Sequence, residues 1–392
     1  MILKVSFLAV NYANENKKTL ISPPNKIYKL SGSSIIDISS GIDFNESVID
    51  MNGFNGYLNF KRQGIQTVYE SDSQLIQDLK AGAILTSTYW DVLENYPETN
   101  NSFLIIETNQ PYYTYRGTLT YRTEFNVHNR NGSMESPLIL PLDPQYITKI
   151  TCRKLPDNIV YYKNLVINIG ENTTTNRLLN IACDRCVVEG ISFKQGDVVY
   201  TTHPTYVTIN GSTFTNLINF NAEFPNISSN GGYTYLLEMT HTYNVKIEKF
   251  RGTGDGWGST GSNLCQRTTF NNCTLSRIDF HNPSIEYLRI IDCDIGYWGV
   301  LCTTIGDVDI RGGSFIFSNL STRDSQSSFI MSRSELRGMC YGNLTIDGTT
   351  FYNFTDRNIY ILYHSSDSND SLPENSPLEN IFWKSVTIKN IK

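Results

Sequence analysis

The chain has 392 residues, of which 40% are hydrophobic and 18% charged, so it can bury a large core and is not a disordered protein. Its formal net charge of −6, together with the lack of any run rich in Lys and Arg, argues against a nucleic-acid binder. No apolar stretch reaches the roughly 18 residues of a membrane span, so membrane insertion is not expected.

The N-terminal third contains several unlike segments. MILKVSFLAVNYA (1–13) has a short apolar core and a single positive charge, Lys4, which is weak for a signal peptide, so we predict a first β-strand there. Residues 42–60 are predicted to form hairpins or the first rung of a repeat. DSQLIQDLKAG (72–82) has the spacing of a short amphipathic helix. The Tyr-rich stretch 96–148 is expected to form an inserted or capping subdomain.

A short pattern recurs along the rest of the chain: an apolar residue, one spacer, Gly, Asn or Asp, two spacers and a second apolar residue. Copies begin at Val188, Ile209, Ile247 (a degraded copy), Phe270, Ile290, Ile310, Ile346 and Ile388. The third position holds Gly190, Gly211, Lys249, Asn272, Asp292, Gly312, Gly348 and Asn390. All but the lysine are types that tolerate a left-handed backbone, so a sharp turn is expected at one point of every copy.

The third positions of three successive copies are 20 residues apart, which suits one rung of a coil of short strands. The pattern therefore predicts an all-β chain folded as a right-handed parallel β-helix, with a β-rich region over 1–148 and the coil over 149–392. A β-propeller and a β-sandwich are the alternatives. The last copy starts at Ile388 and stops at Lys392, inside a rung. We expect that end to be covered by neighbouring subunits of a trimer or by further polypeptide.

One stretch, LSRIDFHNPS (275–284), alternates in a way that suggests a site. On a strand, Ile278 and Phe280 would enter the core, and Arg277, Asp279 and His281 would be exposed on the other side. Counted from the first residue of each repeat copy, residues of the two neighbouring rungs fall at similar positions. These are Asp255 and Trp257 on the preceding rung and Tyr297 and Trp298 on the following rung. Stacked rungs would bring these seven side chains into one patch.

Such a patch suits a sugar polymer. Asp255 and Asp279 are candidates for the two carboxylates of a glycoside hydrolase. His281 is a candidate base, and with Arg277 neutralising a uronate it would support a lyase instead. The aromatic residues would pack against sugar faces as part of a binding surface: Trp257, Tyr297 and Trp298.

Simpler interpretations remain for these residues. Arg277 and Asp279 can be an ordinary surface ion pair. Asp292 of the DxD at 292–294 occupies the turn position that Gly and Asn fill elsewhere, so no metal is expected there. The CxxC of Cys183 and Cys186 lacks a second ligand pair. We therefore expect neither a metal nor another cofactor, and we expect the eight cysteines to be buried and reduced, as in a protein folded in a cytoplasm.

The rung pattern and the surface rich in Asn, Ser, Thr and Tyr resemble the pectin-lyase-like β-helices of bacteriophage tailspikes. The stretch IETNQPYYTYRGTLTYRTEFNVHNRNGSMESPLILPL (106–142) resembles tail proteins that degrade colanic acid. This resemblance implies a homotrimer of the virion tail that contacts other tail or baseplate proteins and binds, and often cleaves, bacterial surface polysaccharide. It carries over no catalytic residue.

Two other classes of protein stay open. One is a non-catalytic phage fibre or decoration protein that binds glycan or only builds the particle. The other is a secreted bacterial polysaccharide lyase or hydrolase, which a clear signal peptide would favour.

Overall fold

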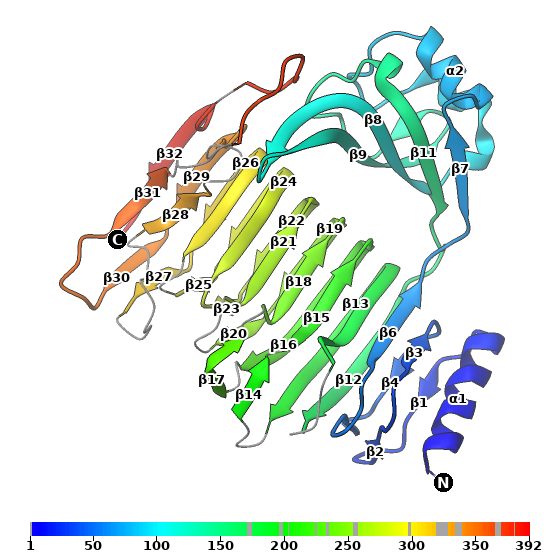
Figure 1. The fold of residues 1–392 in the computed structure, drawn as a ribbon, viewed down its shortest axis with the longest axis vertical. Helices are drawn as coiled ribbons and strands as arrows, with labels where there is room; N and C mark the ends of the chain where they lie inside the picture. Colours follow the sequence, from blue (N-terminus) through cyan, green and yellow to red (C-terminus); the bar gives the residue numbers. More distant parts are fainter. Residues whose placement is uncertain are drawn as a thin grey trace.

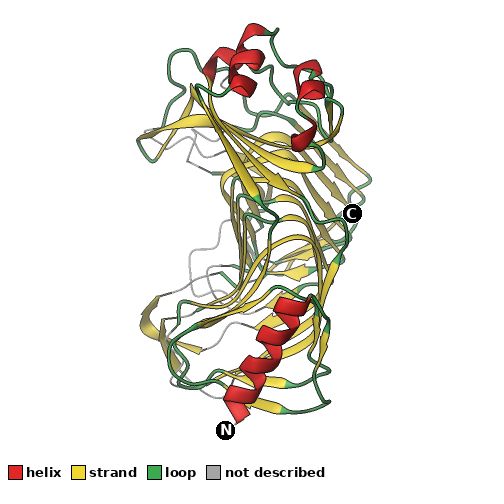
Figure 2. Ribbon diagram, turned by 90° about the vertical axis from the view of Figure 1, so that its right-hand side faces the viewer, coloured by secondary structure: helices red, strands yellow, loops and turns green. Residues whose placement is uncertain are grey.

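The computed structural model describes residues 2–170, 175–195, 199–202, 204–223, 226–232, 235–253, 258–296, 299–318, 328–333, 339–364, 370–379 and 381–392. Most of the described chain forms one coil of parallel strands, and a smaller antiparallel subdomain with short helices lies at one side of it (Figures 1 and 2). The all-β prediction and the parallel coil are confirmed. Among the described residues, no helix is long and apolar enough to cross a membrane.

Each rung of the coil contributes strands to up to three faces, named A, B and C in the order in which the chain passes them. Face A contains β3 (Ile35–Ile38), β6 (Tyr57–Arg62), β15 (Thr205–Asn210), β18 (Leu237–Thr240), β21 (Thr260–Asn263), β28 (Ser328–Ser332) and β31 (Tyr360–His364). Face B contains β1 (Leu20–Ile21), β4 (Ile42–Asp43), β19 (Tyr243–Glu248), β22 (Cys265–Asn271), β29 (Asn343–Asp347) and β32 (Ser385–Lys389). Face C contains β2 (Ile27–Lys29), β5 (Val48–Asp50), β20 (Arg251–Thr253), β23 (Thr274–Leu275), β25 (Asp294–Ile295), β27 (Ser314–Phe317) and β30 (Thr350–Asn353).

Five longer strands bend around a corner and so belong to two or three faces: β12 (Val160–Ile169), β13 (Arg177–Gln195), β16 (Thr213–Glu223), β24 (Ile278–Ile291) and β26 (Val300–Arg311). Parallel pairing stacks equivalent residues of successive rungs. Leu179, Val207 and Leu237 pair in this way, and all three are fully buried. Such apolar columns fill the inside of the coil, because alternate side chains of each strand point inward.

The corner between faces B and C explains the sequence repeat. Consecutive rungs place there Gly190, Asn219, Lys249, Asn272, Asp292, Gly312, Gly348 and Asn390, and each has a positive φ, between 50° and 77°. The expected left-handed turn is thus confirmed, even for the lysine. One copy was placed wrongly: Gly211 turns the corner between faces A and B, beside His241 of the next rung.

The antiparallel subdomain interrupts the coil between β6 and β12. Its strands are β7 (Gln66–Glu70), β8 (Ser102–Tyr115), β9 (Thr118–Arg130), β10 (Ser133–Met134) and β11 (Ile147–Lys154), in the order β10-β9-β8-β11-β7. Its helices are α2 (Gln74–Ala81) and the 3-10 turns η1 (Asp91–Asn95), η2 (Pro97–Thr99) and η3 (Pro144–Tyr146). A separate parallel pair consists of β14 (Val199–Thr202) and β17 (Asn226–Gly232).

Polar contacts at both ends of the subdomain, among others, fix it on the coil. On β11, Arg153 forms a buried ion pair of 2.8 Å with Asp184 of β13. At the tip of the β8–β9 hairpin, Asp370 Oδ1 accepts a hydrogen bond of 2.8 Å from the Gly117 backbone N–H. The coil already begins at β1, so the boundary predicted at residue 148 does not separate it from the rest of the chain.

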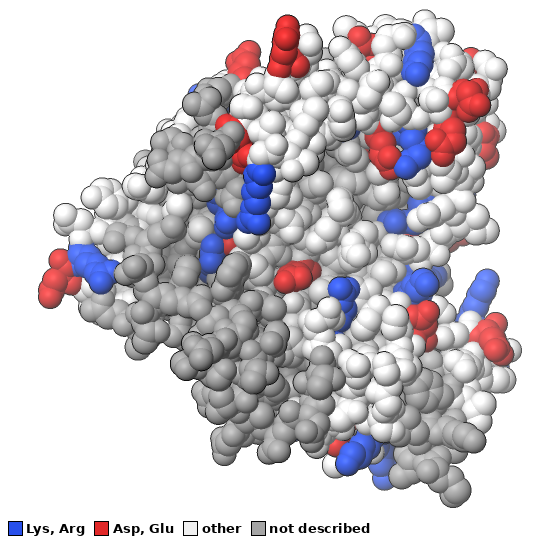
Figure 3. Space-filling view, viewed as in Figure 1, with Lys and Arg blue, Asp and Glu red and all other residues white. Residues whose placement is uncertain are grey.

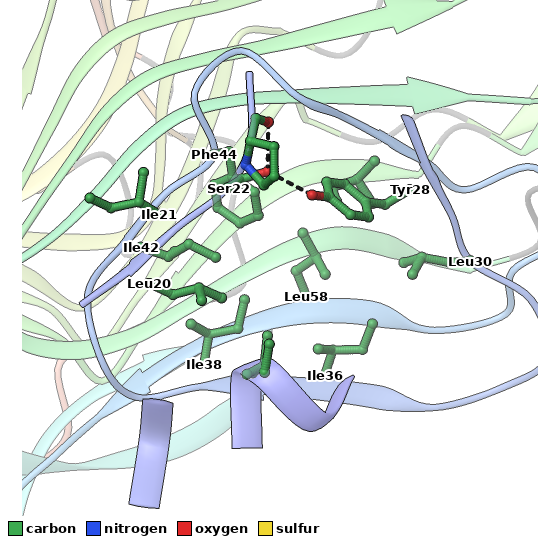
Figure 4. Close-up of a pocket in the computed structure, with 14 residues that line it drawn as sticks. Leu20, Ile21, Ser22, Tyr28, Leu30, Ile36, Ile38, Ile42, Phe44 and Leu58 are labelled. Atoms are coloured by element: carbon green, nitrogen blue, oxygen red, sulfur yellow. Dashed lines mark hydrogen bonds between the residues drawn. The ribbon is translucent and has the colours of Figure 1, made fainter. Parts of the chain in front are cut away.

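The predicted first strand over 1–13 is wrong, because α1 (Ile2–Asn16) is a helix that lies against the first rung. A helix satisfies its own backbone groups, so it can cover the open end of the core without a strand partner. Asn14 anchors it by accepting from the backbone N–H groups of Ser39 and Ser40. A cavity of about 380 Å³, lined by apolar side chains such as Ile36 and Leu58, remains between α1 and the rungs (Figure 4).

Candidate functional site

The stretch that alternates in the sequence forms the start of β24, on face A. Ile278 and Phe280 are fully buried in the core, as predicted. The expected exposure of Arg277 and Asp279 is wrong: the arginine is 7% exposed and the aspartate 0%. Their side chains do point away from the core, but groups from neighbouring rungs cover them.

Asp279 is the centre of a buried polar cluster. Its Oδ1 accepts from Arg333 Nη1 at 2.5 Å, and its Oδ2 accepts from Arg277 Nη2 at 2.5 Å and from the Tyr235 hydroxyl at 2.6 Å. His281 Nε2 lies 3.5 Å from the same Oδ2. A charge removed from water is tolerated only when it is paired and hydrogen-bonded, which these donors achieve.

Tyr235 reaches Asp279 because the rung between them has no side chain in the way. Asp279 pairs with Gly261, and an added Cβ at Gly261 would lie 2.4 Å from Tyr235 Cδ2. The glycine therefore makes room for the ring. Burial, followed by the charge of Asp279, raises the pKa of Tyr235, so its hydroxyl keeps its proton.

Tyr235 also determines which ring nitrogen of the neighbouring His281 carries a proton. Its hydroxyl lies 2.8 Å from His281 Nε2 and donates its own proton to Asp279. The hydroxyl oxygen therefore accepts from His281, and Nε2 carries a proton. In a neutral His281 ring only Nδ1 is then left as a base. The side chain of His281 is 14% exposed, at the edge of the cluster.

Asp279 belongs to a column of polar side chains along face A. Through successive strand pairs the column runs from Asp37 through Asn59, Asn180, Thr208, Glu238 and Gly261 to Asp279. Its first members bond to one another: Asn180 Nδ2 donates to Asn59 Oδ1 at 2.7 Å, and the Thr208 hydroxyl donates to Asn180 Oδ1 at 2.7 Å.

Glu238 is a third carboxyl group of the column, beside Asp37 and Asp279, and it was not among the site residues predicted from the sequence. It is half-buried, and burial raises the pKa of Glu238, against the opposing effects of a hydrogen bond with Thr205 and the charge of Arg177. Two rungs separate Glu238 from Asp279, so their backbones are about 10 Å apart. A carboxyl group that stays neutral to a higher pH can donate a proton.

Four of the seven predicted site residues lie outside the described residues: Asp255, Trp257, Tyr297 and Trp298. The described residues that flank them, Gly258 and Gly299, are in contact with the residues at the start of β24. An added Cβ at Gly258 would lie 2.7 Å from Arg277 Cδ, and the Ile278 backbone N–H donates to the Gly299 carbonyl at 3.1 Å. The structure brings together Arg277, Asp279 and His281.

Three residues of the site were missed. Tyr235 and Arg333 lie just before β18 and just after β28, outside the repeated pattern, so no local signal identified them. Glu238 had a usable signal, because it stands between Leu237 and Met239 as Asp279 stands between Ile278 and Phe280.

The arrangement can bind and orient a polar polymer. Asp279 is inaccessible, so it holds Arg277, Arg333 and Tyr235 in place and does not itself contact a ligand. Around Asp279, the groups that reach solvent in part are His281 and Arg333, and Glu238 is partly exposed two rungs away. In the view of Figure 3, acidic and basic side chains lie interspersed on the subdomain, and others are scattered over the described part of the coil.

One comparison with known proteins supports the tail-protein resemblance. No family model matches the chain. Over 290 residues, or 72% of its length, the chain is 26% identical to the capsule KL64-specific depolymerase of Klebsiella phage P510, and it spans 28% of that protein. Among solved structures, the tailspike protein gp49 from Pseudomonas phage LKA1 is similar with a TM-score of 0.45 and 13% identity, over 98% of this chain and 73% of that one. The first match confirms the resemblance to phage proteins that act on surface polysaccharide.

Proposed function

We propose that this chain binds bacterial capsular or related surface polysaccharide on face A and depolymerises it. The observation that carries the proposal is the similarity, over 290 residues, to a phage capsule depolymerase. The partly exposed groups of face A, Glu238 and His281, support it, because both can hydrogen-bond to the hydroxyl groups of a sugar chain. Asn59, Asn180 and Thr208 of the column are buried and bond to their neighbours, so they support the rungs from beneath.

The roles that we propose follow the exposure of the groups. His281 contacts the sugar, as do Asp255 and the aromatic residues Trp257, Tyr297 and Trp298 from the adjoining rungs. Arg277 and Asp279 position the site from beneath. Hydrolysis is the favoured reaction, because the column carries carboxyl groups. An elimination with His281 Nδ1 as base is the alternative.

The assay is incubation with a panel of purified capsular polysaccharides and exopolysaccharides, including KL64 capsule and colanic acid. New reducing ends without an absorbance from unsaturated uronate would support a hydrolase, and both signals together would support a lyase. A preparation that neither binds nor shortens any member of the panel would refute the proposal.

A non-catalytic glycan-binding role is the second candidate, favoured by one observation. The carboxylate at the centre of the cluster is 0% exposed and has both oxygens occupied by donors, so it cannot act directly on a sugar. Binding of a polysaccharide without any loss of its chain length would support this role instead.

We further propose a right-handed, pectin-lyase-like coil that assembles as a homotrimer in the phage tail, with other tail proteins as neighbours, and acts at the bacterial surface. Crossovers between parallel strands are right-handed in about 98% of cases. Exposed aromatic side chains on the last rungs support self-association: Tyr352, Phe354, Tyr360 and Tyr363. Sedimentation at several protein concentrations tests the trimer, and a monomer at all of them would exclude it.

A further inference from the structure

A second polar cleft lies away from face A, along the corner between faces B and C. It has a volume of about 450 Å³. Three successive rungs each supply two side chains to it: Asn219 and Asn221, Lys249 and Arg251, and Asn272 and Thr274. The strand pairing sets this order, because Asn221, Arg251 and Thr274 are direct partners.

Lys249 occupies a position for which lysine is a poor choice. The other described members of this corner from Gly190 to Asn390 are Gly, Asn or Asp, and Lys249 shares their left-handed backbone with a φ of 54°. That conformation is less favourable for a residue with a side chain than for glycine, although Arg185 and Arg267 also adopt it outside this corner. The lysine is therefore not explained by the turn itself.

The two cations of the cleft have no counter-charge in the described part of the chain. Lys249 and Arg251 are exposed, and no carboxyl group lines the cleft. Glu223, two residues beyond Asn221 on β16, is not among its lining residues. Two adjacent, unneutralised cations on a chain of net charge −6 form a local site for an anion.

The neutral side chains around the cations indicate which anion. A guanidinium group binds a carboxylate through two parallel hydrogen bonds, and lysine adds a point charge. The asparagines above and below offer both donors and acceptors, which suits sugar hydroxyl groups better than a bare inorganic ion.

We propose that this cleft is a binding site for a uronate residue of an acidic polysaccharide, separate from the site on face A. Lys249 and Arg251 bind the carboxylate, and the amides of Asn219, Asn221 and Asn272 bind the hydroxyl groups. The inference deepens the proposed function, since it names an acidic sugar as the ligand. It does not require cleavage.

The decisive variant is Lys249→Asn, because asparagine already occupies this corner at Asn219 and Asn272. The variant should fold at least as well as the wild type, so any loss of binding is not a loss of structure. Arg251→Gln is the second variant. Lys194→Asn, an exposed lysine outside the cleft, is the matched control.

Binding of tetragalacturonate is measured by calorimetry at low salt, with maltotetraose and inorganic phosphate as comparison ligands. We expect at least a tenfold loss of tetragalacturonate affinity in Lys249→Asn and in Arg251→Gln, no change in Lys194→Asn, and little binding of maltotetraose. Affinity that stays within twofold of wild type in Lys249→Asn would overturn the site. Equal affinity for phosphate would overturn its assignment to a sugar.

The outcome is independent of capsule digestion. If tetragalacturonate binding depends on Lys249 but no polysaccharide of the panel is shortened, the depolymerase proposal fails and this site stands. If digestion is seen and the tetragalacturonate affinity is unchanged in Lys249→Asn, the depolymerase proposal stands and this site fails.

Discussion

Replacing Asp279 by Asn should destabilise the coil strongly, although the two side chains have almost the same size. Asp279 accepts from Arg277, Arg333 and Tyr235, and the two arginine side chains are only 8% and 13% exposed. An asparagine would retain one acceptor oxygen and would turn an amide N–H₂ toward one of the guanidinium groups. Two buried cations would then have lost their anion.

Breaking a buried ion pair by removing one partner costs about 3–5 kcal/mol. We expect a loss in this range for Asp279→Asn, out of the roughly 5–15 kcal/mol that stabilises a typical folded domain. Had Asp279 been an exposed catalytic carboxylate, as the sequence suggested, this variant would lose turnover and keep its fold. The buried position of Asp279 reverses the second part of that expectation.

The assay is urea-induced unfolding followed by circular dichroism, with refolding as a check of reversibility. Asp309→Asn is the matched control, because Asp309 accepts from Arg311, whose side chain is 64% exposed, and its loss should leave the unfolding midpoint almost unchanged. An unfolding midpoint for Asp279→Asn equal to that of the control would refute the buried cluster as a source of stability.

Three further predictions concern Asp292 at the corner, Tyr235 and Glu238. At the corner, Asp292→Gly should be nearly neutral and Asp292→Val should cost about 1–2 kcal/mol in urea unfolding, since Asp292 has a φ of 50°; equal midpoints would contradict this. Because the pKa of Tyr235 is raised above its ordinary value of 10.0, the stability that its neutral hydroxyl contributes is present below pH 10 and is lost as the pH rises further. Tyr235→Phe should therefore show a shallower alkaline decline in melting temperature than the wild type, and parallel curves would argue against it. Glu238→Gln should lower polysaccharide turnover by about 10²–10⁴ if Glu238 donates a proton, and should remove the fall in wild-type rate as the pH rises past the raised pKa of this group; an unchanged pH profile would exclude that role.

The sequence predicted those parts of the fold that depend on local backbone preference. Gly190, Asn272 and Asp292 identified the corner because a left-handed turn needs such residues, whatever surrounds them. The same reasoning misplaced Gly211, because a glycine turns either corner equally well, and the pattern does not say which one.

Features that depend on contacts between distant segments were not predictable in this way. The burial of Asp279 results from Tyr235 and Arg333, which reach it from 44 and 54 residues away in the chain. The helix at the start of the chain forms over an exposed end of the core that exists only after the rungs have stacked. In both cases the outward side of a strand or the end of a coil is covered by residues outside the repeat.

The central claim, a polysaccharide site on face A, is tested most directly by a crystal structure of the protein with an oligosaccharide from a polysaccharide that it binds. We expect a sugar chain that runs along the polar column and contacts Glu238 and His281, with Asp279 beneath it and out of contact. An oligosaccharide bound with no contact to face A would contradict the account.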